Sequence, residues 1–106
     1  MELEQLKANY FYKLESENKS KQATKERIRI IKTYITEEYF KEFTLSEYIS
    51  FIKKLQQCNY SLGHFIKIKK CINKFIKTYF PLLYNQIRTE LIISNQYIYL
   101  KQKDTI

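Results

Sequence analysis

The sequence predicts an all-α protein, folded as a compact bundle of four to five helices. Hydrophobic residues make up 44% of the chain and charged residues 28%, a balance typical of a folded globular protein. A single glycine and a single proline leave little material for the tight turns of β-hairpins. The chain has 106 residues, the length of one ordinary domain, so we expect 1–106 to form a single helical domain.

Two helices are expected in the N-terminal part. The first covers about 2–16, where apolar residues follow helical spacing at Leu3, Leu6, Tyr10, Phe11 and Leu14. The polar stretch ESENKSK then predicts an exposed connection. A second helix is expected to begin near Ser20 or Thr24, since both residue types cap helices well, and to run to about Phe40. Its apolar stripe consists of Ile28, Ile31, Tyr34, Ile35 and Tyr39.

The third expected helix has the clearest start signal in the chain. In TLSE, the Thr44 side chain can accept a hydrogen bond from the third helical residue while Glu47 reaches back, which forms a capping box. The apolar face then follows at Tyr48, Phe51, Ile52 and Leu55. We expect this helix to end near Gln57.

The fourth expected helix starts after the cap Ser61 and stops before Pro81, because proline interrupts the helical hydrogen bonds. One of its faces is apolar and consists of Phe65, Ile68, Ile72, Phe75, Ile76 and Tyr79. A fifth helix is expected from Pro81 to about Ile93. The alternation in QYIYL, near the C-terminus, predicts either a short strand or an extended tail held against the bundle.

Positive charge is concentrated in the second half of the sequence. The formal net charge is +8, and no acidic residue lies between Glu47 and Glu90. Within this stretch, four lysines fall nearly opposite the apolar face of the fourth helix; we call Lys67, Lys70, Lys74 and Lys77 the lysine stripe. A face that is only solvated usually mixes Glu with Lys. The asymmetry therefore favours a polyanionic partner over a merely solvated face.

Duplex DNA is the leading candidate for this partner. Each lysine of the stripe could meet a backbone phosphate, with Lys53 and Lys54 extending the patch. Such contacts would bring affinity without sequence preference, while Asn73, within the stripe, could read base edges.

The residues needed for catalysis or metal binding are sparse. His64 is the only histidine and Asp104 the only aspartate, and the spacing of His64 from Cys58 and Cys71 fits no common zinc site. A single glycine rules out a glycine-rich phosphate loop. We therefore expect no enzyme activity, no metal and no cofactor. His64 is expected to be partly exposed near a helix start.

The two cysteines and the N-terminal sequence bear on the compartment. Nothing in MELEQLKANY resembles a secretory signal, so both thiols are expected to be reduced and buried in a cytoplasmic protein. No apolar run approaches the roughly 20 residues of a membrane span.

Three successive segments carry a resemblance to a known family. SKQATKERIRIIKTYI, FTLSEYISFIKKL and NYSLGHFIKIKKCINKFIKTYF resemble, in order and capping pattern, the core-binding, SAM-like domain of tyrosine recombinases and phage integrases. The likeness covers about 20–80, including the Phe51 to Leu55 spacing and the Ser61 and Phe75 positions. It implies a helical module that clamps DNA, with the lysine stripe as contacts, in a small accessory protein of a phage, plasmid or transposon.

The chain departs from that family in two respects. Its turn before the last of these helices is CNYS, where the family often has glycine. It also has only three arginines, Arg27, Arg29 and Arg88, and one histidine, so the catalytic set of the recombinases is absent. The resemblance thus implies DNA binding without recombination activity.

A protein–protein interaction module is the alternative function. Small basic helical bundles of this size include bacteriocin immunity proteins and phage-encoded inhibitors of host or defence proteins. The C-terminal stretch IISNQYIYLKQ would supply the contact residues for an acidic protein partner, namely Tyr97, Ile98, Tyr99 and Leu100. The apolar faces also allow a homodimer.

Overall fold

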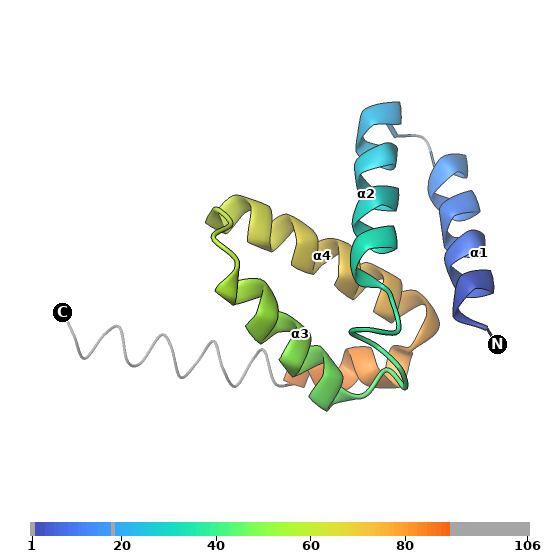
Figure 1. The fold of residues 1–106 in the computed structure, drawn as a ribbon. Helices are drawn as coiled ribbons and strands as arrows, with labels where there is room; N and C mark the ends of the chain where they lie inside the picture. The colour runs from blue at the N-terminus through green and yellow to red at the C-terminus, as the bar shows by residue number, and fades with distance from the viewer. Residues whose placement is uncertain (1, 18, 90–106) are drawn as a thin grey trace.

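The computed structural model describes residues 2–17 and 19–89. Four helices follow one another in the chain, and a fifth helical segment covers 81–89 (Figure 1). The four are α1 (Leu3–Ser16), α2 (Lys21–Tyr34), α3 (Leu45–Gln57) and α4 (Leu62–Tyr79). The expected all-α bundle is confirmed, and the described residues contain no strand. The continuation of the fifth helix to Ile93 and the stretch QYIYL lie outside the described residues.

Local capping signals set where three of these helices begin. The Ser20 side chain accepts a hydrogen bond from the backbone N–H of Ala23 at 3.2 Å. The capping box at the start of α3 is present as predicted, and Ser61 caps α4 through the backbone N–H of His64, also at 3.2 Å. These side chains pair backbone donors that a helix start would otherwise leave without a partner.

Glu47 does more than close its capping box. Its carboxylate also accepts hydrogen bonds from the backbone N–H groups of Lys41 at 2.6 Å and Glu42 at 3.1 Å. Burial raises the pKa of this carboxyl group, but the bonds from Thr44, Lys41 and Glu42 outweigh it and hold the pKa below its usual value. Glu47 therefore fastens the α2–α3 connection onto the start of α3.

The second helix ends earlier than the sequence predicted. It stops at Tyr34, and residues 35–40 form turns instead of a helix reaching Phe40. Ile35 and Phe40 are both fully buried, and the ring of Phe43 is stacked between those of Phe40 at 5.0 Å and Phe80 at 4.0 Å. The prediction was wrong because these long-range contacts outweigh the local helical pattern.

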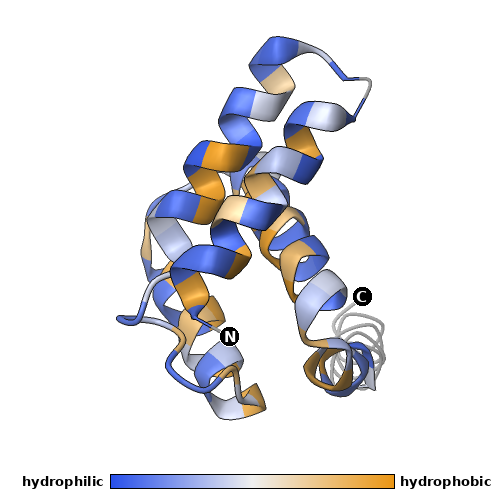
Figure 2. Ribbon diagram, turned by 90° about the vertical axis from the view of Figure 1, so that its right-hand side faces the viewer, coloured by the Kyte–Doolittle hydropathy of each residue, from blue (hydrophilic) through white to orange (hydrophobic). Residues whose placement is uncertain are grey.

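Helix α2 lies between α1 and α4, and α3 packs against α4 (Figure 1). Hydrophobic residues occupy the sides of the helices that face one another (Figure 2). Because α2 has neighbours on two sides, Ile30 is buried beside Ile31, although it falls outside the predicted stripe. Phe75 of α4 lies at the centre, with its ring 5.2 Å from that of Tyr10.

A helix that crosses a membrane is about 20 residues long and predominantly apolar. Within residues 2–17 and 19–89, no helix is both long enough and apolar enough to cross a membrane.

Candidate nucleic-acid interface

The lysine stripe is presented by α4 as the sequence predicted. All four of its lysines are exposed, whereas the opposite side of the helix carries Ile68, Ile72, Phe75 and Ile76, each at most 1% exposed. At 1.5 Å per residue, the distance from Lys67 to Lys77 along the helix is about 15 Å. The stripe is thus a continuous row on one side of a helix whose other side is fixed in the core.

The lysines of the stripe differ in what surrounds them. Lys67 forms an ion pair with Glu26 of α2 at 2.7 Å, and the hydrogen bond from Lys67 is the main reason that the pKa of Glu26 is lowered. The Lys77 ammonium lies 5.5 Å from the centre of the Tyr84 ring. Lys70 and Lys74 form no ion pair with a residue of the described ranges. Folding thus places the acidic Glu26 beside Lys67, at one end of a stripe whose own stretch of sequence contains no acidic residue.

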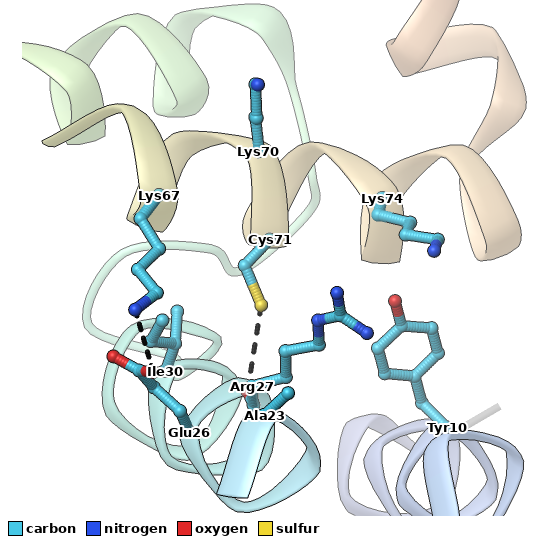
Figure 3. A pocket seen from close by; sticks show the side chains of 9 residues that line it. All are labelled: Tyr10, Ala23, Glu26, Arg27, Ile30, Lys67, Lys70, Cys71 and Lys74. Carbon is cyan, nitrogen blue, oxygen red and sulfur yellow. Dashed lines mark hydrogen bonds and ion pairs between the residues drawn. The ribbon is translucent and has the colours of Figure 1, made fainter. Parts of the chain in front are cut away.

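A hollow of about 290 Å³ lies between α4, α2 and α1, beside the stripe. Figure 3 shows that Lys67 and Lys74 reach down beside it, while Lys70 points away. At one end, the Arg27 guanidinium and the Lys74 ammonium are directed toward the hydroxyl of Tyr10 (Figure 3). At the other end lies the Lys67–Glu26 pair.

Sequence reasoning missed Arg27 as a candidate site residue. Its side chain is half-buried and lines the hollow, and it forms no ion pair with a described residue. The available signal was the charged pair Glu26–Arg27 within the apolar pattern of the second helix, three to four residues before two buried isoleucines. Recognising it required knowing that α2 packs against α4.

The two cysteines have different environments. Cys71 is half-buried beside the hollow, its thiol lies 3.7 Å from the Arg27 carbonyl, and burial raises its pKa to about 11. Cys58 is exposed at the end of α3, so the expectation of a buried thiol was wrong there. The reason is that α3 ends at Gln57, so Cys58 lies in the connection that follows and not on the buried face of the helix. Both cysteines are free.

The remaining predicted DNA contacts lie on α3 or are engaged in the fold. Lys53 and Lys54 are exposed on α3, and the Lys54 ammonium lies 5.3 Å from the centre of the Tyr39 ring, beside the α2–α3 connection. Asn73 is half-buried, and its side-chain oxygen accepts a hydrogen bond from the Tyr48 hydroxyl at 2.6 Å. Asn73 thus links α4 to α3, which leaves its amide N–H₂ as the group that could meet a partner.

The residues of the alternative interface, Tyr97, Ile98, Tyr99 and Leu100, lie outside the described residues. His64 is half-exposed at the start of α4, as expected, with its ring 4.7 Å from that of Tyr60. Among the described residues, His, Cys, Asp and Glu side chains do not gather into any group of three that could hold a metal ion.

Comparison with known proteins gives no further assignment: no family model, no curated protein and no solved structure matches this chain.

Proposed function

We propose that this chain is a small DNA-binding or accessory protein that binds the backbone of duplex DNA through the lysine stripe. The observation that carries the proposal is the row of exposed lysines on α4, of which Lys70 and Lys74 have no acidic partner among the described residues. Ammonium groups spaced over about 15 Å can meet a run of phosphates. Their binding is favourable because it releases the counterions condensed on DNA. The resemblance to integrase core-binding domains supports the same function and suggests a mobile genetic element as its source.

The stripe reads charge rather than sequence. Lysine contacts to phosphates position a protein without identifying bases, and the side-chain oxygen of Asn73 is already bonded to Tyr48. The proposed binding is therefore non-specific and sensitive to salt.

The test compares two variants with the same loss of charge. One replaces all four lysines of the stripe with glutamine, and the control replaces Lys13, Lys21, Lys25 and Lys41, which are exposed elsewhere. Fluorescence anisotropy with a random-sequence duplex at low salt should show at least about a tenfold loss of affinity for the stripe variant. The control should lose much less. An equal loss in both variants would mean that DNA affinity depends on net charge and not on where the lysines lie, which would contradict the proposal.

A second function is favoured by a different observation on the same helix. Leu62 is 74% exposed and Ile66 40% exposed, one helical turn apart and next to Lys70. Exposed apolar residues beside cations suit an acidic protein partner with an apolar anchor. Replacing Leu62 and Ile66 with serine should leave DNA affinity unchanged but abolish the binding of a protein partner at this surface.

A further inference from the structure

The hollow beside the stripe has properties that backbone binding by the stripe does not use. It is lined by residues of three helices, and the Tyr10 side chain that reaches it is only 2% exposed. The ring of Tyr10 packs edge-on against Phe75 at 5.2 Å and Tyr79 at 6.0 Å, so its orientation is fixed. Phenylalanine would make the same ring contacts. The hydroxyl of Tyr10 therefore needs a separate explanation.

The Tyr10 hydroxyl has no hydrogen-bond partner among the described residues. Three other tyrosines use their hydroxyl groups within the fold: Tyr34 and Tyr60 bond to each other, and Tyr48 donates to Asn73. Like any tyrosine with an ordinary or raised pKa, Tyr10 is protonated and able to donate at neutral pH, and burial is the main cause that raises its pKa further. The hydroxyl is aimed at the end of the hollow where Arg27 and Lys74 converge (Figure 3), so it is open to water or to a ligand in the hollow.

These three groups form a set of donors suited to one anionic group. A guanidinium can donate two parallel hydrogen bonds to a phosphate, an ammonium adds a second positive charge, and a phenol donates one more bond. The rest of the hollow differs in character. Ala23, Ile30 and Cys71 line it with apolar surface, and at the far end the Glu26 carboxylate retains acceptor sites beyond its bond to Lys67.

We infer that the hollow between α1, α2 and α4 binds a nucleoside monophosphate or a closely related phosphate monoester. The phosphate is held by Arg27, Lys74 and the Tyr10 hydroxyl. The flat heteroaromatic body lies over Ala23, Ile30 and Cys71, and its N–H donors face Glu26. A volume of about 290 Å³ suits a ligand of this small size. This inference does not rest on DNA binding: Lys74 belongs to both surfaces, but Arg27 and Tyr10 lie outside the lysine stripe.

The test is a titration of the full chain, without DNA, followed by amide chemical shifts. Adenosine 5′-monophosphate should give saturable shifts at Tyr10, Ala23, Arg27 and Cys71. Inorganic phosphate should bind more weakly, because it lacks the heteroaromatic part of the ligand. Adenosine, which lacks the phosphate, should not bind at the same concentration. Absence of saturable shifts with the nucleotide would overturn the inference. So would equal binding of the nucleotide and inorganic phosphate, or equal binding of the nucleotide and adenosine.

Three single variants assign the contacts. Arg27→Gln should weaken nucleotide binding about tenfold, and Tyr10→Phe several-fold, since each removes a hydrogen bond to a charged group. Arg29→Gln is the matched control, because Arg29 is exposed on the same helix and does not line the hollow; it should bind normally. Without ligand, Tyr10→Phe should unfold at the same temperature as the unmodified protein or higher. Unchanged binding by both Arg27→Gln and Tyr10→Phe would overturn the assignment.

Discussion

The two sides of α4 differ in how completely their polar groups are paired. Toward α3, the Tyr48 hydroxyl donates to Asn73, and the carboxylate of Glu47 accepts from three backbone N–H groups. Toward α1 and α2, Glu26 pairs with Lys67, but Arg27 and Lys74 line a hollow of about 290 Å³ and form no ion pair with a described residue. Hollows of about 280 and 300 Å³ also border α3, so it is the two cations at the hollow that set the α2 side apart. Paired groups stabilise the fold, whereas unpaired groups that line a hollow are available to a ligand. The comparison therefore associates the α3 side with stability and the α2 side with the proposed binding.

The largest effect on stability is expected from the aromatic packing on the α3 side. Phe51 is 1% exposed and its ring lies 5.5 to 5.7 Å from those of Phe40, Tyr39 and Tyr34. Phe51→Ala should lower the free energy of unfolding by about 3–5 kcal/mol, measured by urea denaturation. Arg27→Gln on the other side should change it by less than about 0.5 kcal/mol. Similar losses in the two variants would remove the distinction between the sides.

A smaller effect, dependent on pH, is expected from Glu47. Replacing it with glutamine weakens the bonds that fasten the α2–α3 connection and should cost about 1 kcal/mol at neutral pH. Because the folded pKa of Glu47 lies below its ordinary value of 4.5, its contribution is complete above that value and is lost as the pH falls through the lowered pKa. Urea denaturation of both proteins at pH 7 and pH 3 should show the difference shrink. A constant difference would contradict the role of the carboxylate charge.

The same substitution on opposite sides of α4 sharpens the comparison further. Tyr48→Phe leaves the side-chain oxygen of Asn73 without its donor and should cost about 1 kcal/mol. Tyr10→Phe removes a hydroxyl with no partner among the described residues and should cost nothing or stabilise slightly. Thermal unfolding of the two variants measures this directly. A larger loss of stability for Tyr10→Phe than for Tyr48→Phe would mean that the Tyr10 hydroxyl stabilises the fold, which would contradict this comparison.

The smallest expected effect on folding belongs to Glu26, whose replacement should instead affect DNA binding. Glu26→Gln releases Lys67 from its ion pair at 2.7 Å and leaves that lysine available to a phosphate. We expect little change in thermal unfolding, tighter binding of duplex DNA and a steeper dependence on salt. Weaker DNA binding by this variant would mean that the ion pair positions Lys67 rather than competing for it.

What could be predicted from the sequence follows the range of the interactions involved. The caps Ser20, Thr44 and Ser61 act on residues three positions away, so their sequence patterns were sufficient. The end of α2 was mispredicted, because it depends on rings as distant in sequence as Phe40 and Phe80. The stripe itself follows from helical periodicity alone.

The hollow, in contrast, could not be predicted from local patterns. Glu26 and Lys67 are 41 residues apart in the chain, and they meet only because α2 packs against α4. Tyr10 follows the apolar spacing predicted for the first helix and is buried, but that spacing says nothing about where its hydroxyl points. Tertiary packing therefore determines the candidate binding site, whereas local sequence determines most of the helices.

The salt dependence of duplex DNA binding by the unmodified protein tests the central claim most directly. Each phosphate neutralised contributes about −0.9 to the slope of log affinity against log salt concentration. With Lys67 held by Glu26, the three other lysines of the stripe predict a slope of about −2.7, and Glu26→Gln should bring it to about −3.6. Absence of binding at low salt, or a slope shallower than about −1, would contradict the assignment of the lysine stripe as a DNA-binding surface.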